Sequence, residues 1–111
     1  MPLYMLQGCY TQGAVKNLVA RPEDRAKAGS ALVKAIGGKL HQYFMSFGEY
    51  DFVALMEFPD DQGPAATSLA LGAAGHVTNL KTTKLLTVAE AMKAMQAAGA
   101  AASSIAPPKG K

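Results

Sequence analysis

The sequence predicts an α+β fold, with strands and helices in the order β-α-β-β-α-β and a further helix near the C-terminal end. Four segments of strand length are rich in apolar, aromatic and β-branched residues, and patterns of helical period separate the first from the second and the third from the fourth. Half of the 111 residues are hydrophobic, yet only 17% are charged, which is little for the surface of a small isolated domain. We therefore expect one domain with a small core that packs against another chain.

The first strand is expected at residues 3–11, LYMLQGCYT, which contain no proline. Apolar residues then recur at spacings of three and four, which is typical of one face of a helix. Because proline is tolerated in the first turn of a helix and is disruptive later, Pro22 divides this pattern. We expect a short helical segment, a break just before the proline, and a helix at 22–36 that ends at the two glycines 37–38.

A β-hairpin follows, with strands at 39–47 and 50–58 joined by a tight turn at Gly48 and Glu49. The third strand, YDFVALMEF, is apolar on both faces: one carries Phe52, Ala54, Met56 and Phe58, and the other carries Val53 and Leu55 between Asp51 and Glu57. A strand that is apolar on both faces is covered on both faces. Helices of the same chain can cover only one of them.

Residues 59–61, PDD, end the third strand and offer Asp60 or Asp61 as the N-cap of the next helix. That helix, QGPAATSLALGAAG, consists mainly of small residues and is expected to pack through a stripe of Ala65, Ala66, Leu69 and Ala73. The segment 76–86, HVTNLKTTKLL, is the expected fourth strand.

A capping box, TVAE at 87–90, begins the last helix, because its threonine and glutamate can each satisfy a backbone N–H at a helix start. The composition changes at Gly99 to alanine, serine, proline and lysine, which is typical of a flexible tail. The expected organisation is one domain at 1–98 and a tail at 99–111.

This order of elements is that of the ferredoxin-like split βαβ arrangement. Right-handed crossovers then give an antiparallel sheet in the order 4-1-3-2, with both main helices on one face. The third strand is central, so its second apolar face needs a cover from outside the chain. A second sheet of the same kind would provide it, as in a sheet-to-sheet dimeric α/β barrel.

Three stretches, GEYDFVALMEFPDD, GGKLHQYFMSFGEYD and LALGAAGHVTNLKTTKLL, resemble the GYD-domain family. The resemblance extends from about Leu3 to about Leu86. It implies a fold similar to the dimeric α/β barrels, in which two ferredoxin-like sheets pack face to face, and hence a homodimer or an assembly of dimers. The positions that carry over are Gly48, Tyr50 and Asp51, which are the expected ligand-binding residues. The resemblance implies no particular substrate.

Asp51 admits two interpretations at the start of a buried strand. Its carboxylate can accept backbone N–H groups at the hairpin or across a dimer interface, as short Asp side chains at turns often do. Alternatively it is an acid/base or ligand-anchoring group, because partial burial raises a carboxyl pKa toward neutrality. The first interpretation is slightly favoured. Tyr50 could offer its hydroxyl to a ligand, although aromatic packing is the more common role.

His41 and His76 are the only histidines. The predicted sheet order places their strands at opposite edges, so one chain does not unite them in a metal site. His41 remains a candidate catalytic group together with Asp51 and Tyr50. No cluster of metal-ligand spacing and no glycine-rich phosphate loop occurs in the sequence, and no metal or cofactor is expected.

The rest of the composition narrows the partners and the compartment. Lys81 and Lys84 do not form the basic patch that nucleic-acid binding requires, although the net charge is +3. Cys9 is the only cysteine, so an intramolecular disulfide is excluded. The start of the chain does not resemble a signal peptide, and no apolar stretch reaches membrane-spanning length. A cytoplasmic location without membrane contact is expected.

Two classes of function remain open at this point. The first is a cofactor-free binding module, in which pockets between sheet and helices hold a small apolar or aromatic molecule. The second is a cofactor-independent enzyme for proton transfer, isomerisation or oxidation, using Asp51 with Tyr50 or a histidine. The second rests on the chemistry of related folds, and a fold does not determine a function.

Overall fold

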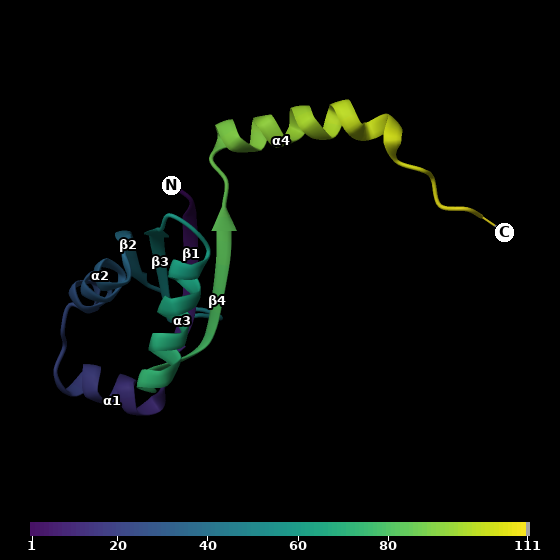
Figure 1. Cartoon of the computed structure of the whole chain (residues 1–111). Helices are drawn as coiled ribbons and strands as arrows, with labels where there is room; N and C mark the ends of the chain where they lie inside the picture. Colours follow the sequence, from purple (N-terminus) through teal and green to yellow (C-terminus); the bar gives the residue numbers. More distant parts are fainter. Residues whose placement is uncertain (111) are drawn as a thin grey trace.

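Helices cover one face of a four-stranded antiparallel sheet in the computed structural model, which describes residues 1–110 (Figure 1). The elements in chain order are β1 (Leu3–Tyr10), α1 (Gln12–Ala20), α2 (Arg25–Ile36), β2 (Lys39–Met45), β3 (Phe52–Glu57), α3 (Gln62–Ala74), β4 (Val77–Leu85), α4 (Val88–Ala101) and a 3-10 turn at Ala102–Ser104. The strand order is β2-β3-β1-β4, with every neighbouring pair antiparallel. The predicted α+β class and the ferredoxin-like sheet order are therefore confirmed.

The core lies between the sheet and the helices α2 and α3. Every second residue of β1 and β3 points to this side, because side chains alternate across a strand. The buried apolar residues are Tyr4, Leu6, Tyr10, Val33, Phe52, Ala54, Met56, Phe58 and Val77. Removal of this apolar surface from water is the main stabilising contribution to the fold.

The opposite face of the sheet carries a second apolar surface, which we call the outer face. Met5 lies opposite Leu55 in the β1–β3 pairing, and Phe44 lies opposite Val53 in the β2–β3 pairing. The side chains on the two central strands are half-exposed, and Phe44 is exposed. Among the described residues no helix covers this face, in agreement with the two-sided pattern of β3 (Figure 1).

The connection between β2 and β3 differs from the predicted tight turn. It spans residues 46–51, and it is closed by the Ser46 N–H, which donates to the Asp51 carbonyl at 2.8 Å, and by the Ser46 hydroxyl, which donates to the Tyr50 carbonyl at 2.6 Å. A loop of this width does not need a left-handed residue. Within residues 1–110 the glycines with positive φ are Gly37 and Gly75, so Gly48 does not adopt the left-handed conformation typical of a tight turn.

The break at Pro22 is confirmed, and α2 begins slightly later than predicted. Asp24 is its N-cap, and the Asp24 carboxylate accepts the N–H of Ala26 at 2.9 Å. The helix ends where Gly37 adopts a left-handed conformation with φ of 103°. Local capping chemistry therefore sets both ends of this helix.

The buried side of α3 was predicted incorrectly. Gly63, Pro64 and Thr67 face the core, whereas Leu69 of the predicted stripe is 75% exposed. Phe58 is the reason, because its ring lies where a side chain at position 63 would stand. A helix of small residues carries little hydrophobic periodicity, so contact with this ring decides which side faces inward.

The last helix, α4, begins at the predicted capping box of Thr87 and Glu90. It continues past Gly99 to Ala101, beyond the predicted domain boundary at 98. The helix projects from the end of β4 away from the sheet, and Met92 and Met95 are exposed (Figure 1). The flexibility of the 99–111 tail stays a prediction. None of the helices formed by residues 1–110 combines the length and hydropathy needed to cross a bilayer.

Candidate functional site

A cavity of about 230 Å³ lies between the sheet and the two covering helices. The helices face it with small residues, Ala28 and Gly29 from α2 and Ala70 and Ala74 from α3, and these leave space above the strands. Larger apolar side chains form the remaining walls, among them Leu6, Val33, Leu40, Met56, Leu71 and Val77. An apolar cavity with few polar groups is typical of sites that hold small molecules.

Three aromatic rings from adjacent strands form one end of the cavity. Tyr43 of β2 stacks on Phe52 of β3, with ring centroids 5.6 Å apart and the rings 6° from parallel. Tyr10 of β1 lies on the other side of Phe52, at a centroid distance of 5.4 Å. Stacked rings present planar surfaces, which favour contact with another flat ring.

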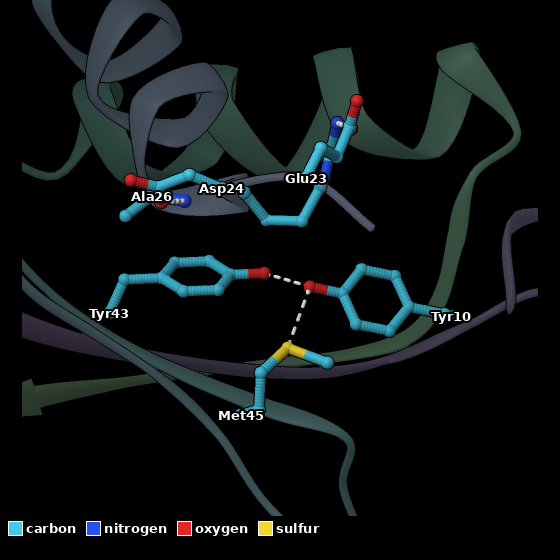
Figure 2. Close-up of polar contacts among 7 residues, drawn as sticks. Tyr10, Glu23, Asp24, Ala26, Tyr43 and Met45 are labelled. Carbon is cyan, nitrogen blue, oxygen red and sulfur yellow. Dashed lines mark hydrogen bonds and ion pairs between the residues drawn. The ribbon is translucent and has the colours of Figure 1, made fainter. Parts of the chain in front are cut away.

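The hydroxyl groups of Tyr10 and Tyr43 are hydrogen-bonded to one another. Figure 2 shows them pointing toward each other, with the Met45 thioether on one side and Glu23, Asp24 and Ala26 on the other. The Tyr10 hydroxyl also contacts the Met45 sulfur at 3.5 Å. Burial, reinforced by the bond to Tyr10, raises the pKa of Tyr43, so this hydroxyl stays protonated at neutral pH. We call the two residues the tyrosine pair.

A second hollow of about 540 Å³ adjoins the cavity below α1 and the α1–α2 connection. Tyr10, Arg25 and His76 line both spaces and therefore mark the passage between them. The Arg25 guanidinium donates through Nη1 to the Glu23 carboxylate at 2.6 Å. The side chain of Arg25 is 30% exposed and that of Glu23 is 55% exposed, so the cation is the more deeply placed partner. This passage is the charged end of a mainly apolar site.

The predicted residue Asp51 does not line the cavity, but it holds a residue that does. Its carboxylate accepts the backbone N–H of Tyr10 at 2.9 Å, while its own N–H donates to the Gly8 carbonyl at 2.8 Å. These bonds continue the β1–β3 pairing beyond its last paired residues. The structure thus shows Asp51 bound to backbone groups, as in the favoured interpretation. The N–H that it accepts belongs to Tyr10, the last residue of β1, whose ring lines the cavity.

The structure does not bring the other predicted site residues together. His41 lies on the edge strand β2 and its Nε2 is 2.8 Å from a carboxylate oxygen of Glu57. Glu57 and Asp51 lie at opposite ends of β3, roughly 20 Å apart at about 3.3 Å per residue. Tyr50 and Gly48 belong to the loop between β2 and β3 and do not line the cavity. Their roles in ligand binding stay predictions.

The tyrosine pair and Arg25 were not predicted. Tyr10 and Tyr43 lay in predicted strands, and strand alternation placed Tyr10 on the same side as Leu6. Their meeting depends on the pairing register of β1 and β2 with β3, and β2 shifts its register between Leu40 and Gln42. Among residues 1–110 no group of three or more His, Cys, Asp or Glu side chains is arranged to hold a metal ion.

The fold and cavity define a ferredoxin-like domain with an internal apolar space between its helices and its sheet. The sequence matches the GYD domain over residues 4–95, and the chain belongs to the GYD-domain family. A solved transcriptional regulator from Neisseria meningitidis, in complex with L-Met, is similar in fold, with a TM-score of 0.52 and 15% sequence identity. The similarity covers 78% of this chain and 51% of the regulator, so this chain spans about half of that protein. Comparison with curated proteins finds no match.

Proposed function

We propose that this protein is a cofactor-free module that binds a small apolar or aromatic molecule in the cavity between α2, α3 and the sheet. The observation that supports this is a cavity lined mainly by apolar and aromatic side chains, with Arg25, His76 and the Tyr10 hydroxyl at one end; the polar residue Thr67, which also lines it, donates its hydroxyl to the Gly63 carbonyl. The cavity and the adjoining hollow together have a volume within the range of about 300–1,000 Å³ found for ligand pockets.

The regulator of similar fold supports the proposal only in general terms. Its structure contains L-Met, so a protein of this fold can hold a small molecule. At 15% identity the likeness concerns the fold and does not identify a ligand for this chain. The choice of an apolar or aromatic ligand rests on the cavity walls of this chain.

A cofactor-independent enzyme is the less supported alternative. Its proposed acid/base group, Asp51, already accepts the N–H of Tyr10, and His41 is paired with Glu57 at the far end of β3. A general base must lie within hydrogen-bonding reach of the proton it removes. Since these groups do not converge on the cavity, their geometry favours the binding module.

We also propose that two copies associate through their outer faces. Leu3, Met5, Val53 and Leu55 form a half-exposed apolar strip on the two central strands, and burial of such a strip favours association. The low content of charged residues agrees with this proposal. The partner is a second copy because the open surface is the face of a sheet, which an identical sheet can cover.

The binding proposal is tested by titrating the ¹⁵N-labelled chain with indole, a small neutral aromatic probe. We expect saturable shifts at the amides of Val33, Leu71 and Val77, which line the cavity. Ala70→Leu fills the space from α3 and should weaken indole binding about tenfold or more, equivalent to about 1.4 kcal/mol. Ala73→Leu is the control, since position 73 is exposed, as position 70 is, but does not line the cavity.

Two results would contradict the binding proposal. One is the absence of saturable shifts with indole and with a wider set of neutral aromatic probes. The other is an equal effect of the Ala70→Leu and Ala73→Leu substitutions, which would place binding elsewhere on the surface.

A further inference from the structure

We propose that the ligand carries a carboxylate, bound by Arg25 and the tyrosine pair, with its aromatic body inside the cavity. This inference rests on the proposed binding function and specifies the chemical class of the ligand as an aromatic carboxylate. The groups at the passage between the two spaces support it through their charge, their unused hydrogen-bonding capacity and their shape.

Charge is the first argument. Arg25 is the only residue with a permanent charge among those that line the inner cavity, and no Asp or Glu is found among the described lining residues. His76 lies at the same end, and Arg21 lines the outer hollow. An anion bound at the passage therefore lies near two arginines and the His76 imidazole. The acidic side chain that lines the hollow is that of Glu23, and the carboxylate of Asp24, beside the tyrosine pair, already accepts the N–H of Ala26.

Hydrogen-bonding capacity is the second argument. A guanidinium has five N–H donors in a planar fork that matches a carboxylate. Within residues 1–110 the only hydrogen bond found for the Arg25 side chain runs from Nη1 to Glu23. The remaining donors can bind a second carboxylate while the Glu23 pair persists, or the more exposed Glu23 side chain can turn to solvent when a ligand arrives.

The tyrosine pair supplies a further donor. Two phenol groups have two protons, and one of them makes the bond between Tyr10 and Tyr43. The contact available to the Tyr10 hydroxyl in the structure is the Met45 sulfur, a weak acceptor. A carboxylate oxygen is a much stronger acceptor than a thioether. A ligand carboxylate would therefore complete the hydrogen bonding of the pair.

Shape is the third argument. Tyr43 and Phe52 stack almost in parallel, and Tyr10 lies against Phe52 from the neighbouring strand. This arrangement places flat aromatic surfaces directly beside the polar passage. A ligand with a planar ring and a carboxylate on a short flexible arm can place its ring against the aromatic side chains and its carboxylate at the passage.

The test compares two probes of nearly equal shape, indole-3-propionate and its neutral amide, indole-3-propionamide, on the full chain at pH 7.5. We expect the carboxylate to bind at least tenfold more tightly by NMR titration and to shift the Arg25 Nε–H resonance. Arg25→Gln should remove this preference, so that the carboxylate binds no more tightly than the amide to the same variant. Lys34→Gln makes the same change of charge on α2 outside the cavity and should retain the preference.

The possible outcomes separate failure of the carboxylate inference from failure of the proposed binding function. Equal binding of the two probes to the wild-type chain overturns this inference and leaves the binding function intact, and this result needs no variant to fold. A preference that persists in folded Arg25→Gln also overturns the inference. If neither probe nor indole binds, the binding function itself is wrong and the inference falls with it.

Discussion

The backbone N–H of Tyr10 connects the signature carboxylate Asp51 with the cavity, although the two residues are 41 positions apart. Tyr10 is the last residue of β1, where pairing with β3 has already ended. Its N–H needs an acceptor because the residue is buried. Asp51 provides this acceptor and so fixes the strand end from which the Tyr10 ring reaches the cavity. In this arrangement Asp51 acts as a positioning residue for the site.

Substitution of Asp51 should therefore lower both the free energy of unfolding and the affinity of the cavity for indole. Asp51→Asn keeps an acceptor oxygen and should lower the free energy of unfolding by about 1–2 kcal/mol, because a hydrogen bond to a neutral acceptor contributes less than one to a charged acceptor. Asp51→Ala leaves the Tyr10 N–H unpaired, so it should cost more and should weaken indole binding through Tyr10. Urea unfolding and the indole titration measure the two effects. An Ala variant as stable as wild type would contradict this role.

Tyr4 gives the chain a pH dependence in the alkaline range. Its hydroxyl donates to the Asp61 carboxylate at 2.6 Å, and this bond is the main cause that raises the pKa of Tyr4 from 10.0 to about 12. Since the folded pKa lies above the unfolded one, the stabilising contribution is complete below pH 10 and is lost as the pH rises through 12.

We expect Tyr4→Phe to reduce this alkaline loss. The free energy of unfolding, measured in urea at pH 9 and pH 11.5, should fall less in the variant than in the wild-type chain. Burial also raises the pKa of Tyr43, so part of the alkaline loss should remain in the variant. Equal losses in the two proteins would show that the Tyr4–Asp61 bond contributes nothing.

At the scale of elements, the contact between α3 and Phe58 determines how this helix lies on the sheet. Phe58 is fully buried directly after β3, and it occupies the position that a side chain at residue 63 would need. A Cβ atom at position 63 would overlap Cδ1 of the Phe58 ring. The first turn of α3 can therefore approach the sheet only with glycine at this position.

Two glycines of α3 should respond in opposite directions to the same substitution. Gly63→Ala forces the buried Phe58 ring to move, and overpacking of this kind costs about 1–3 kcal/mol. Gly72→Ala meets no atom within 4 Å and should stabilise the helix by about 0.5–1 kcal/mol, because alanine loses less conformational freedom than glycine. Thermal unfolding followed by circular dichroism measures both. Equal effects would mean that α3 does not approach Phe58 closely.

At the scale of the whole molecule, the two faces of the sheet differ in how they are covered. The helix side contains the core and the cavity, and the outer face remains open in the single chain. Leu55 and Met5 face each other near its centre. The proposed association would bury this surface and leave the helix side of the sheet, where the cavity lies, uncovered.

We expect sedimentation at micromolar concentration to show a dimer or a larger assembly. Leu55→Glu places a charge on the outer face and should shift the protein to monomers, because an unpaired charge at a buried interface is strongly unfavourable. Leu69→Glu makes the same chemical change on the exposed side of α3 and should not alter assembly. A monomeric wild-type chain, or equal effects of the two substitutions, would exclude association through the outer face.

The sequence alone determined the order of elements, the sheet order and the presence of an open apolar sheet face. These properties depend on signals in the sequence: the apolar residues on both faces of the third strand, the proline at position 22, the capping box at Thr87 and the fixed handedness of crossover connections. Such signals can be recognised in a sequence because residues that are close in the chain lie in the same helix or strand.

Only the tertiary structure decided the site. Tyr10, Tyr43 and Arg25 come from β1, β2 and α2, and they meet because of strand register and of the distance at which the helices lie from the sheet. The width of the loop before Asp51 and the buried side of α3 also depend on contacts between distant residues. A cavity is the volume left between packed elements. Its size depends on distances of a few ångströms between those elements. The periodicity of a sequence predicts which residues share a face, and it does not predict these distances.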